Sequence, residues 1–254
     1  MRCGQKKLGG RRESLLTTKI KWLGHASFEI ITNKGSIIYL DPWINGNPVC
    51  PIKLEEIEKA DIVCVTHGHP DHLGDGIEIA KKTKAKFICS PEIGKYAEMA
   101  GIPYDKENSI PLNIGGSAEI NGISITMVPA VHSSDTWIEG KMYPGSGACG
   151  YVIKTEDNVR IYFAGDTGLF GDMRLIGEVY APHIAILPVG GKYNMGIREA
   201  AIASSFLSPE IVIPMHYGTY PNQMANIDEF IKLVNTLAPK TKVLVPKCGE
   251  YIEY

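Results

Sequence analysis

The sequence predicts a mixed α/β fold of the α+β kind, in which two β-sheets pack together with helices on their outer faces. Short apolar segments of strand length recur through both halves of the chain, and segments with helical periodicity lie between them. With 254 residues, 44% of them hydrophobic, the chain can bury a large core. Because both halves contain strands and helices, we expect layers in the order helix, sheet, sheet, helix.

The first half is expected to open as a β-meander and then to alternate strands with helices. Strands are predicted at residues 19–22, 27–32, 36–40, 62–66 and 87–89. Helices are predicted at residues 76–82 and 91–100. Ser90 as N-cap, Pro91 at the first helical position and Gly101 after the last turn delimit the second helix.

The second half repeats this arrangement. Strands are predicted at residues 118–120, 123–128, 151–154, 160–164, 184–187, 211–214 and 242–245. Helices are predicted at residues 197–206 and 227–237. Asn121-Gly122 between the first two strands is a strong hairpin signal. No linker of low complexity interrupts residues 19–254, so we expect them to form one domain.

Charge is distributed unevenly along the chain. The whole sequence has 26 basic and 28 acidic residues, but residues 1–18 hold five basic and one acidic residue, which leaves residues 19–254 with 21 and 27, or −6. An acidic body favours neither nucleic acid nor a membrane surface as partner, and a small-molecule substrate is expected instead. Residues 1–18 are expected to form a flexible basic tail.

The compartment is predicted from what the sequence does not contain. No apolar segment approaches the roughly 20 residues of a transmembrane helix, and the start has no apolar signal-peptide region. The six cysteines are scattered without a C-x-x-C pair, which is typical of reduced core thiols. We therefore expect a cytoplasmic protein. The sequence does not indicate its oligomeric state.

The most informative segment is THGHPDH at residues 66–72, directly after an apolar strand. Three of the seven histidines of the chain lie here, and His-rich low-complexity tracts do not interleave Gly, Pro and Asp in this way. Imidazoles and carboxylates are ligands that suit Zn²⁺ and its first-row neighbours. The segment therefore predicts a dinuclear metal site to which four residues contribute: His67, His69, Asp71 and His72.

One loop cannot complete the coordination of two ions, so further ligands are expected downstream. Three candidates follow apolar strands, where loops commonly build sites: His132, Asp166 and His216.

The order H-x-H-x-D-H, a lone His, G-D-T-G and a second lone His resembles the metallo-β-lactamase superfamily, over about residues 19–254. The motifs WLGHASF at 22–28, DPW at 41–43 and PVGG at 188–191, followed by Met195-Gly196, resemble one group within it. That group comprises small metal-dependent hydrolases related to ascorbate-6-phosphate lactonase. The resemblance implies a four-layer αββα sandwich and metal-dependent hydrolysis.

The resemblance also implies how the ligands are shared between two divalent ions. The first ion is implied to bind His67, His69 and His132, the second Asp71, His72 and His216, and Asp166 is implied to bridge them. Two such ions about 3.5 to 4 Å apart lower the pKa of a shared water and clamp the substrate. We therefore expect a bridging hydroxide to attack a small ester, lactone or phosphodiester, with Asp71 also the candidate catalytic residue. Zn²⁺ is expected first, with Mn²⁺, Fe²⁺ and Ni²⁺ as alternatives.

Two polar residues near these motifs have two interpretations each. Asp41 resembles the carboxylate that accepts the free N–H of a ligand histidine in this superfamily, but an Asp-Pro turn without a site role fits equally well. His25 either supports the metal ligands or the substrate, or is a hydrogen-bonded structural histidine.

Three other residues are assigned to structure. His183 precedes a strand at the end away from the expected site. Tyr217 and Thr219 flank His216 and are expected to pack.

Residues 133–147, which are polar and irregular, form either a mobile loop over the site or an ordinary connection.

Three alternative functions stay open at this point. An RNA-processing nuclease of the same superfamily is disfavoured by the acidic body. A persulfide dioxygenase-like oxidoreductase would keep a similar histidine loop and differ in metal and in oxygen consumption. A metal-binding protein without catalysis is disfavoured because every ligand position is filled.

Overall fold

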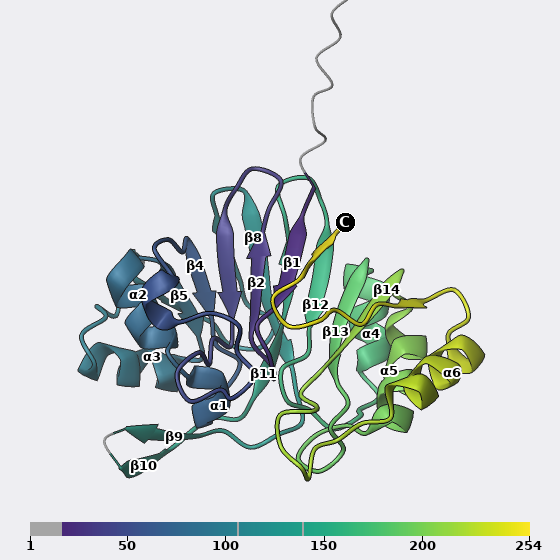
Figure 1. Cartoon of the computed structure of the whole chain (residues 1–254). Coiled ribbons are helices and arrows are strands. Elements are labelled where there is room, and N and C mark those ends of the chain that lie inside the picture. The colour runs from purple at the N-terminus through teal and green to yellow at the C-terminus, as the bar shows by residue number, and fades with distance from the viewer. Residues whose placement is uncertain (1–16, 106, 139) are drawn as a thin grey trace, which may run out of the picture.

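The computed structural model describes residues 17–254 except residues 106 and 139, and Figure 1 shows the strands of two large sheets between two groups of helices. The basic tail predicted at residues 1–18 lies outside the described residues but for Thr17 and Thr18. Thr18 pairs with Tyr254, its backbone N–H donating to the Tyr254 carbonyl at 3.1 Å and its carbonyl accepting from the Tyr254 N–H at 2.9 Å.

Each large sheet has seven strands. The first sheet has the order β16 (Tyr251–Glu253), β1 (Lys19–Trp22), β2 (Phe28–Ile31), β3 (Ile37–Leu40), β4 (Ile62–Cys64), β5 (Lys86–Cys89) and β6 (Ser109–Pro111). The second has the order β15 (Lys242–Val243), β14 (Ile211–Met215), β13 (Ile184–Pro188), β12 (Arg160–Phe163), β11 (Cys149–Lys154), β8 (Ile123–Pro129) and β7 (Ser117–Ile120). A separate hairpin joins β9 (Asp135–Ile138) and β10 (Lys141–Pro144).

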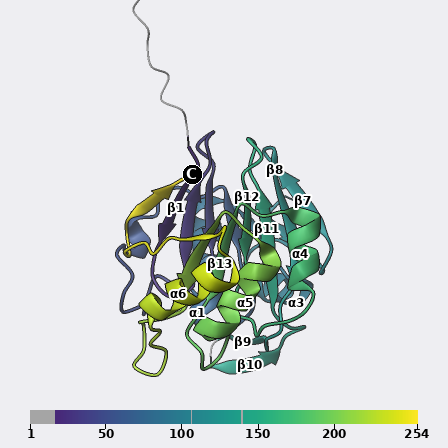
Figure 2. The ribbon, with the colours of Figure 1, turned by 90° about the vertical axis from the view of Figure 1, so that its right-hand side faces the viewer.

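The helices lie outside the sheets and complete four layers (Figures 1 and 2). The first half contributes η1 (Leu54–Glu56), α1 (Pro70–Leu73), α2 (Gly76–Thr83) and α3 (Pro91–Met99). The second half contributes α4 (Met173–Tyr180), α5 (Ile197–Leu207) and α6 (Ile227–Leu237). Buried side chains fill one core between the sheets, where the Phe28 and Phe163 rings lie 6.1 Å apart, and one core under each helical layer. The predicted αββα arrangement is confirmed.

The sequence did not predict β6, β9, β10, β16, α1 and α4. For α4 the physical reason is Gly177, which weakens a helical pattern but is required by packing. A Cβ at Gly177 would lie 2.6 Å from the Phe206 carbonyl oxygen, so glycine lets α4 approach α5 closely. Gly177 thus weakens the helical pattern in the sequence and at the same time allows the contact between α4 and α5. Only that contact explains why glycine occupies this position.

The described part of the chain bears on two further predictions. The five cysteines within it are free thiols, and Cys64, Cys89 and Cys149 are fully buried, as expected. No helix among the described residues has the length and apolar character needed to cross a membrane.

A buried carboxylate joins four strands of the first sheet at a distance from the metal-ligand motifs. Glu29 accepts hydrogen bonds from the hydroxyls of Tyr39 and Tyr251, each at 2.6 Å, and pairs with Lys21 Nζ at 3.0 Å. Burial alone would raise the pKa of Glu29, but these hydrogen bonds and the lysine charge lower it below its ordinary value. The cluster thus ties β16 to β1, β2 and β3.

We expect Glu29→Gln to lower the free energy of unfolding at pH 7 by about 1–3 kcal/mol, because Lys21 loses its charged partner. The folded pKa of Glu29 lies below the unfolded value of about 4.3, so its contribution is present above that value and is lost as pH falls through the folded pKa. The difference between wild type and variant should therefore shrink below about pH 4 in urea titrations.

Glu253→Gln is the matched control, because Glu253 also pairs with a lysine on β1 but is 58% exposed. Its expected effect is below about 0.5 kcal/mol at either pH. Equal effects of the two variants would contradict the role given to Glu29.

Candidate metal centre

The predicted ligands converge because several strands end at the same edge of the two sheets. In the first sheet β3 and β4 are parallel, and Asp41 and the 67–72 segment follow their carboxyl ends. In the second sheet β12 and β14 run parallel through β13, and β8 shares their direction because both β8 and β12 are antiparallel to β11. His132, Asp166 and His216 follow β8, β12 and β14. Their loops therefore meet the 67–72 loop.

The carboxylate of Asp166 lies among imidazoles from three elements. Its Oδ2 is 3.1 Å from Nε2 of His216, 3.6 Å from Nε2 of His72 and 3.7 Å from Nε2 of His132. A tetrahedral ion with bonds of about 2.0–2.1 Å holds its ligand atoms about 3.3 Å apart. Burial would raise the pKa of Asp166, but His216 and His72 lower it well below its ordinary value, so Asp166 is a carboxylate.

The first two histidines of the motif face each other beside this group. Nε2 of His67 lies 3.0 Å from Nδ1 of His69, and His132 completes a set of three possible ligands within 4.8 Å of one another. His69 is the N-cap residue of α1 and Pro70 its first residue, which turns the chain sharply after the strand. Burial lowers the pKa values of His67, His69 and His132. Neutral imidazoles of this kind have a lone pair for a metal ion.

Asp41 orients His72. Its Oδ2 accepts a hydrogen bond from His72 Nδ1 at 2.7 Å, and both residues are fully buried. The Nδ1–H tautomer leaves the lone pair on Nε2, which is buried without a hydrogen-bond partner, as are both ring nitrogens of His216. Buried polar atoms are rarely left unpaired, and a cation between Asp166 and the Nε2 atoms of His72 and His216 would satisfy these two nitrogens. The donor set fits a divalent metal ion. Asp41 does more than begin a turn.

Thr66 is a site residue that the sequence reasoning missed. Its backbone N–H donates to Asp41 Oδ1 at 2.7 Å and its hydroxyl to Asp41 Oδ2 at 2.6 Å. The hydroxyl oxygen then accepts from His67 Nδ1 at 3.0 Å, which leaves Nε2 of His67 free to bind an ion. A hydroxyl at the end of the apolar run Ile62-Val63-Cys64-Val65 was the available signal.

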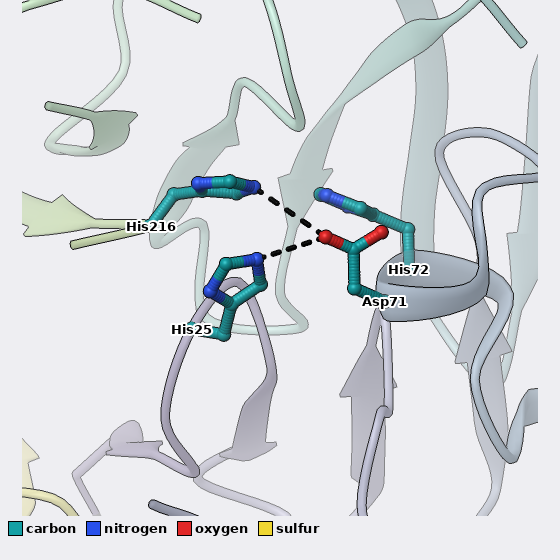
Figure 3. Close-up of side chains that lie close together, drawn as sticks. All are labelled: His25, Asp71, His72 and His216. Atoms are coloured by element: carbon teal, nitrogen blue, oxygen red, sulfur yellow. Dashed lines mark hydrogen bonds and ion pairs between the residues drawn. The ribbon is translucent and has the colours of Figure 1, made fainter. Parts of the chain in front are cut away.

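His25 is buried between the 216–223 loop and Asp71 (Figure 3). Nε2 lies 3.0 Å from Asp71 Oδ2, and Nδ1 lies 2.9 Å from Thr219 Oγ1. The His25 carbonyl accepts from the His216 backbone N–H at 2.9 Å, and the two rings lie 3.7 Å apart. Burial lowers the pKa of His25 to about 4, although the Asp71 hydrogen bond acts in the opposite direction. A neutral His25 donates to Asp71 through Nε2 and accepts from Thr219.

The pairing of Thr219 with His25 corrects the prediction that Thr219 only packs. Asn194 is a second unpredicted contact, since its Nδ2 donates to Asp166 Oδ1 at 2.9 Å. The predictions for two other residues are confirmed. Tyr217 stacks on Trp22 at 5.3 Å, and His183 lies before β13, where its Nδ1 accepts from the Arg160 backbone.

The stretch 133–147 is neither irregular nor a cover over the site. It forms the β9–β10 hairpin, which projects from the body beside α1 (Figure 1). Of its described residues only Ser133 lines the cavity at the candidate centre, and Ser133 Oγ lies 3.4 Å from Nε2 of His69.

That cavity has a volume of about 700 Å³, which suits a small molecule. Five candidate ligands form its floor: His69, Asp71, His132, Asp166 and His216. Seven further residues form its walls: Pro70, Ser133, Tyr193, Tyr220, Pro221, Asn222 and Gln223.

Residues 37–217 match the family described as the β-lactamase superfamily domain. The chain belongs to the β-lactamase superfamily.

Within this superfamily the chain resembles proteins named UPF0173 metal-dependent hydrolases. The one from Koribacter versatilis is 44% identical over 216 residues, covering 85% of this chain and 91% of its own. The one from Methanocaldococcus jannaschii is 45% identical over 235 residues, covering 92% and 99%. The structure of Igni18, a metallo hydrolase from Ignicoccus hospitalis, is 39% identical with a TM-score of 0.82, covering 94% and 98%. The protein is thus a metal-dependent hydrolase of the β-lactamase superfamily.

The hydrogen bonds of Asp41 and Thr66 predict a graded loss of metal affinity in this superfamily member. Asp41→Ala and Thr66→Val should each weaken metal binding about 10- to 100-fold, because a ligand histidine loses the partner that fixes its tautomer. Thr66→Ser keeps the hydroxyl and should stay close to wild type. Competition with a chromophoric chelator measures the affinities.

Asp61→Ala is the control for Asp41→Ala, because Asp61 also bonds a backbone N–H, that of Ile37 at 2.8 Å, but lies just before β4, at the end away from the metal centre. Metal affinity should not change in this variant. Equal weakening by Asp61→Ala would show that loss of stability, rather than of ligand orientation, explains the effect.

Proposed function

We propose that the protein is a dinuclear metallohydrolase that cleaves a small ester, lactone or phosphodiester. The observation that carries this proposal is the position of Asp166 Oδ2, which lies within 3.7 Å of histidines from both predicted ligand sets. His132 belongs to the first set, and His72 and His216 belong to the second. A carboxylate in this position is suited to bridge two ions.

The proposed ligand sets are those that the resemblance implies, and the contacts of Asp166 support them. His67, His69 and His132 would hold the first ion, Asp71, His72 and His216 the second, and Asp166 both. Zn²⁺ is the ion that we propose first, because imidazoles form the majority of the donors, with Mn²⁺, Fe²⁺ and Ni²⁺ as alternatives. When bound, two such ions supply Lewis acidity and lower the pKa of a water between them.

The residues of the chain would orient the ligands and handle a proton. Asp41 and Thr66 hold His72 and His67 in the tautomers that present Nε2. Asp71 lines the cavity while its Oδ2 is held by His25, so we propose its carboxylate as the acceptor of the proton released during the reaction. The cavity volume of about 700 Å³ suits a small-molecule substrate.

A nuclease is the second candidate, and the cavity disfavours it. Among the described residues that line the cavity there is no lysine or arginine to neutralise a phosphate backbone. The persulfide dioxygenase alternative is separated from hydrolysis by metal identity and oxygen consumption.

Removal of metal should abolish hydrolysis, and Zn²⁺ should restore it. Wild type should hold two equivalents of metal per chain, and Asp166→Ala one or none, because the ligand shared by both ions is lost. Metal content by elemental analysis after gel filtration measures this. Asp172→Ala is the control, since Asp172 follows the same strand but is exposed, and it should keep two equivalents. Full activity in metal-stripped protein would refute the proposal.

His25 is proposed as a positioning residue for Asp71. His25→Phe keeps a ring but removes both hydrogen bonds, so kcat should fall about 10- to 100-fold while two equivalents of metal remain. Thr219→Val should shift kcat in the same direction by a smaller factor, and Thr219→Ser should restore it.

His183→Phe is the control, because His183 bonds Arg160 at the end of the fold opposite the metal centre. This variant should leave kcat and metal content unchanged. Loss of one metal equivalent in His25→Phe would contradict the positioning role and identify His25 as a ligand.

A further inference from the structure

The wall of the cavity carries no charge. Asp71 and Asp166 are the only residues with formally charged side chains among the described lining residues, and both belong to the candidate metal centre. The remaining wall offers two tyrosines, two amides, two prolines and a serine. A charged substituent on a bound substrate would lose hydration here without gaining an ion pair. The wall therefore favours a substrate that is uncharged away from its reacting group.

Gln223 is the wall residue whose side chain has a buried polar atom without a hydrogen-bond partner. It is 3% exposed, it lines the cavity, and its Oε1 is buried without a hydrogen-bond partner. Its backbone is fixed by two hydrogen bonds, from its N–H to the Tyr220 carbonyl at 3.0 Å and from the Gly218 N–H to its carbonyl at 2.9 Å. A buried acceptor without a partner is unfavourable, so a substrate donor that reaches Oε1 from the cavity would be stabilised there.

Aromatic rings lie beside this amide. Tyr220 stacks against Trp43, with ring centres 6.2 Å apart, and so stands in a fixed position at the cavity. Tyr193 lines the cavity and is 55% exposed. Lys192 neighbours it, but its Nζ lies over the Tyr193 ring at 5.0 Å and Lys192 is not a lining residue. The rings provide apolar contact for the carbon skeleton of a substrate.

We propose that the cavity takes a small ester, lactone or phosphodiester without charged substituents away from the reacting group, and that Gln223 Oε1 accepts a hydrogen bond from a hydroxyl or N–H group of that substrate. This inference rests on the proposed hydrolase function and narrows it, because it excludes substrates that carry a charge beyond the group that reacts. Gln223 thus determines specificity, and the metal centre determines the reaction.

The test uses the full-length, zinc-loaded protein and three p-nitrophenyl esters with acyl chains of the same length: hexanoate, 6-hydroxyhexanoate and the adipate monoester. Bis(p-nitrophenyl) phosphate represents phosphodiesters. We expect kcat/KM for both neutral esters to exceed that for the anionic adipate monoester at least about 10-fold, because the carboxylate is desolvated without a partner.

Gln223→Leu replaces the amide by an apolar side chain of similar size. The preference for 6-hydroxyhexanoate over hexanoate should fall about 3- to 10-fold, through KM rather than kcat, because one hydrogen bond to the hydroxyl is lost. Asn235→Leu is the matched control on the exposed face of α6 and should keep the wild-type preference. Calorimetric titration with 6-hydroxyhexanamide and hexanamide measures the preference for the hydroxyl group as a ratio of two Kd values, without turnover.

The outcomes separate the two proposals. Hydrolysis of none of the four compounds, with zinc restored, would refute the hydrolase function itself. Hydrolysis of the adipate monoester as efficient as that of the neutral esters would leave that function intact and overturn the neutral-substrate inference. An equal loss with both neutral esters in Gln223→Leu, at unchanged Tm, would show that Gln223 only shapes the wall.

Discussion

The burial of carboxylates between two sheets is the constraint on which the site depends. Asp41 and Asp166 are almost completely removed from solvent, and a buried carboxylate is very unfavourable without compensation. Asp41 is compensated by two donors of Thr66 and by His72, and Asp166 by Asn194 and the facing imidazoles. These contacts connect β3, β4, β12 and β14, so the polar centre can form only when both sheets are in place.

The backbone at this centre is held in conformations that L-residues rarely adopt. Asp41, His25 and His216 have φ values of 43°, 55° and 58°. Such conformations cost about 1–3 kcal/mol each and persist where surrounding contacts determine them. Here the hydrogen bond from the His216 N–H to the His25 carbonyl joins two of the strained residues. These turns place the His25 and His216 rings 3.7 Å apart and direct Asp41 to His72, and the packed sheets hold the turns.

Sequence reasoning predicted what is encoded locally. Strands, helices and the four layers followed from periodicity, and the seven candidate ligands followed from spacing and resemblance; the structure brings all seven together. The contacts of Asn194 and Thr219 join residues far apart in sequence, and no local pattern marks them. The edge strand β16 was missed because Tyr251-Ile252-Glu253 becomes a strand only through pairing with β1. The residues that support the ligands are thus harder to predict from the sequence than the ligands themselves.

The 216–223 loop contributes both to the metal centre and to the cavity wall. It begins at His216, includes Thr219 against His25, and ends in the wall residues Tyr220 and Gln223. Evolution toward a new substrate through this loop would also disturb the geometry of the metal ligands, so its mutations would be pleiotropic. On the β13–α5 connection, Asn194 is also coupled to the centre through Asp166, whereas the neighbouring Tyr193 lines the cavity with an exposed side chain. Divergence among related hydrolases would therefore proceed more easily through the Tyr193 side chain than through the 216–223 loop.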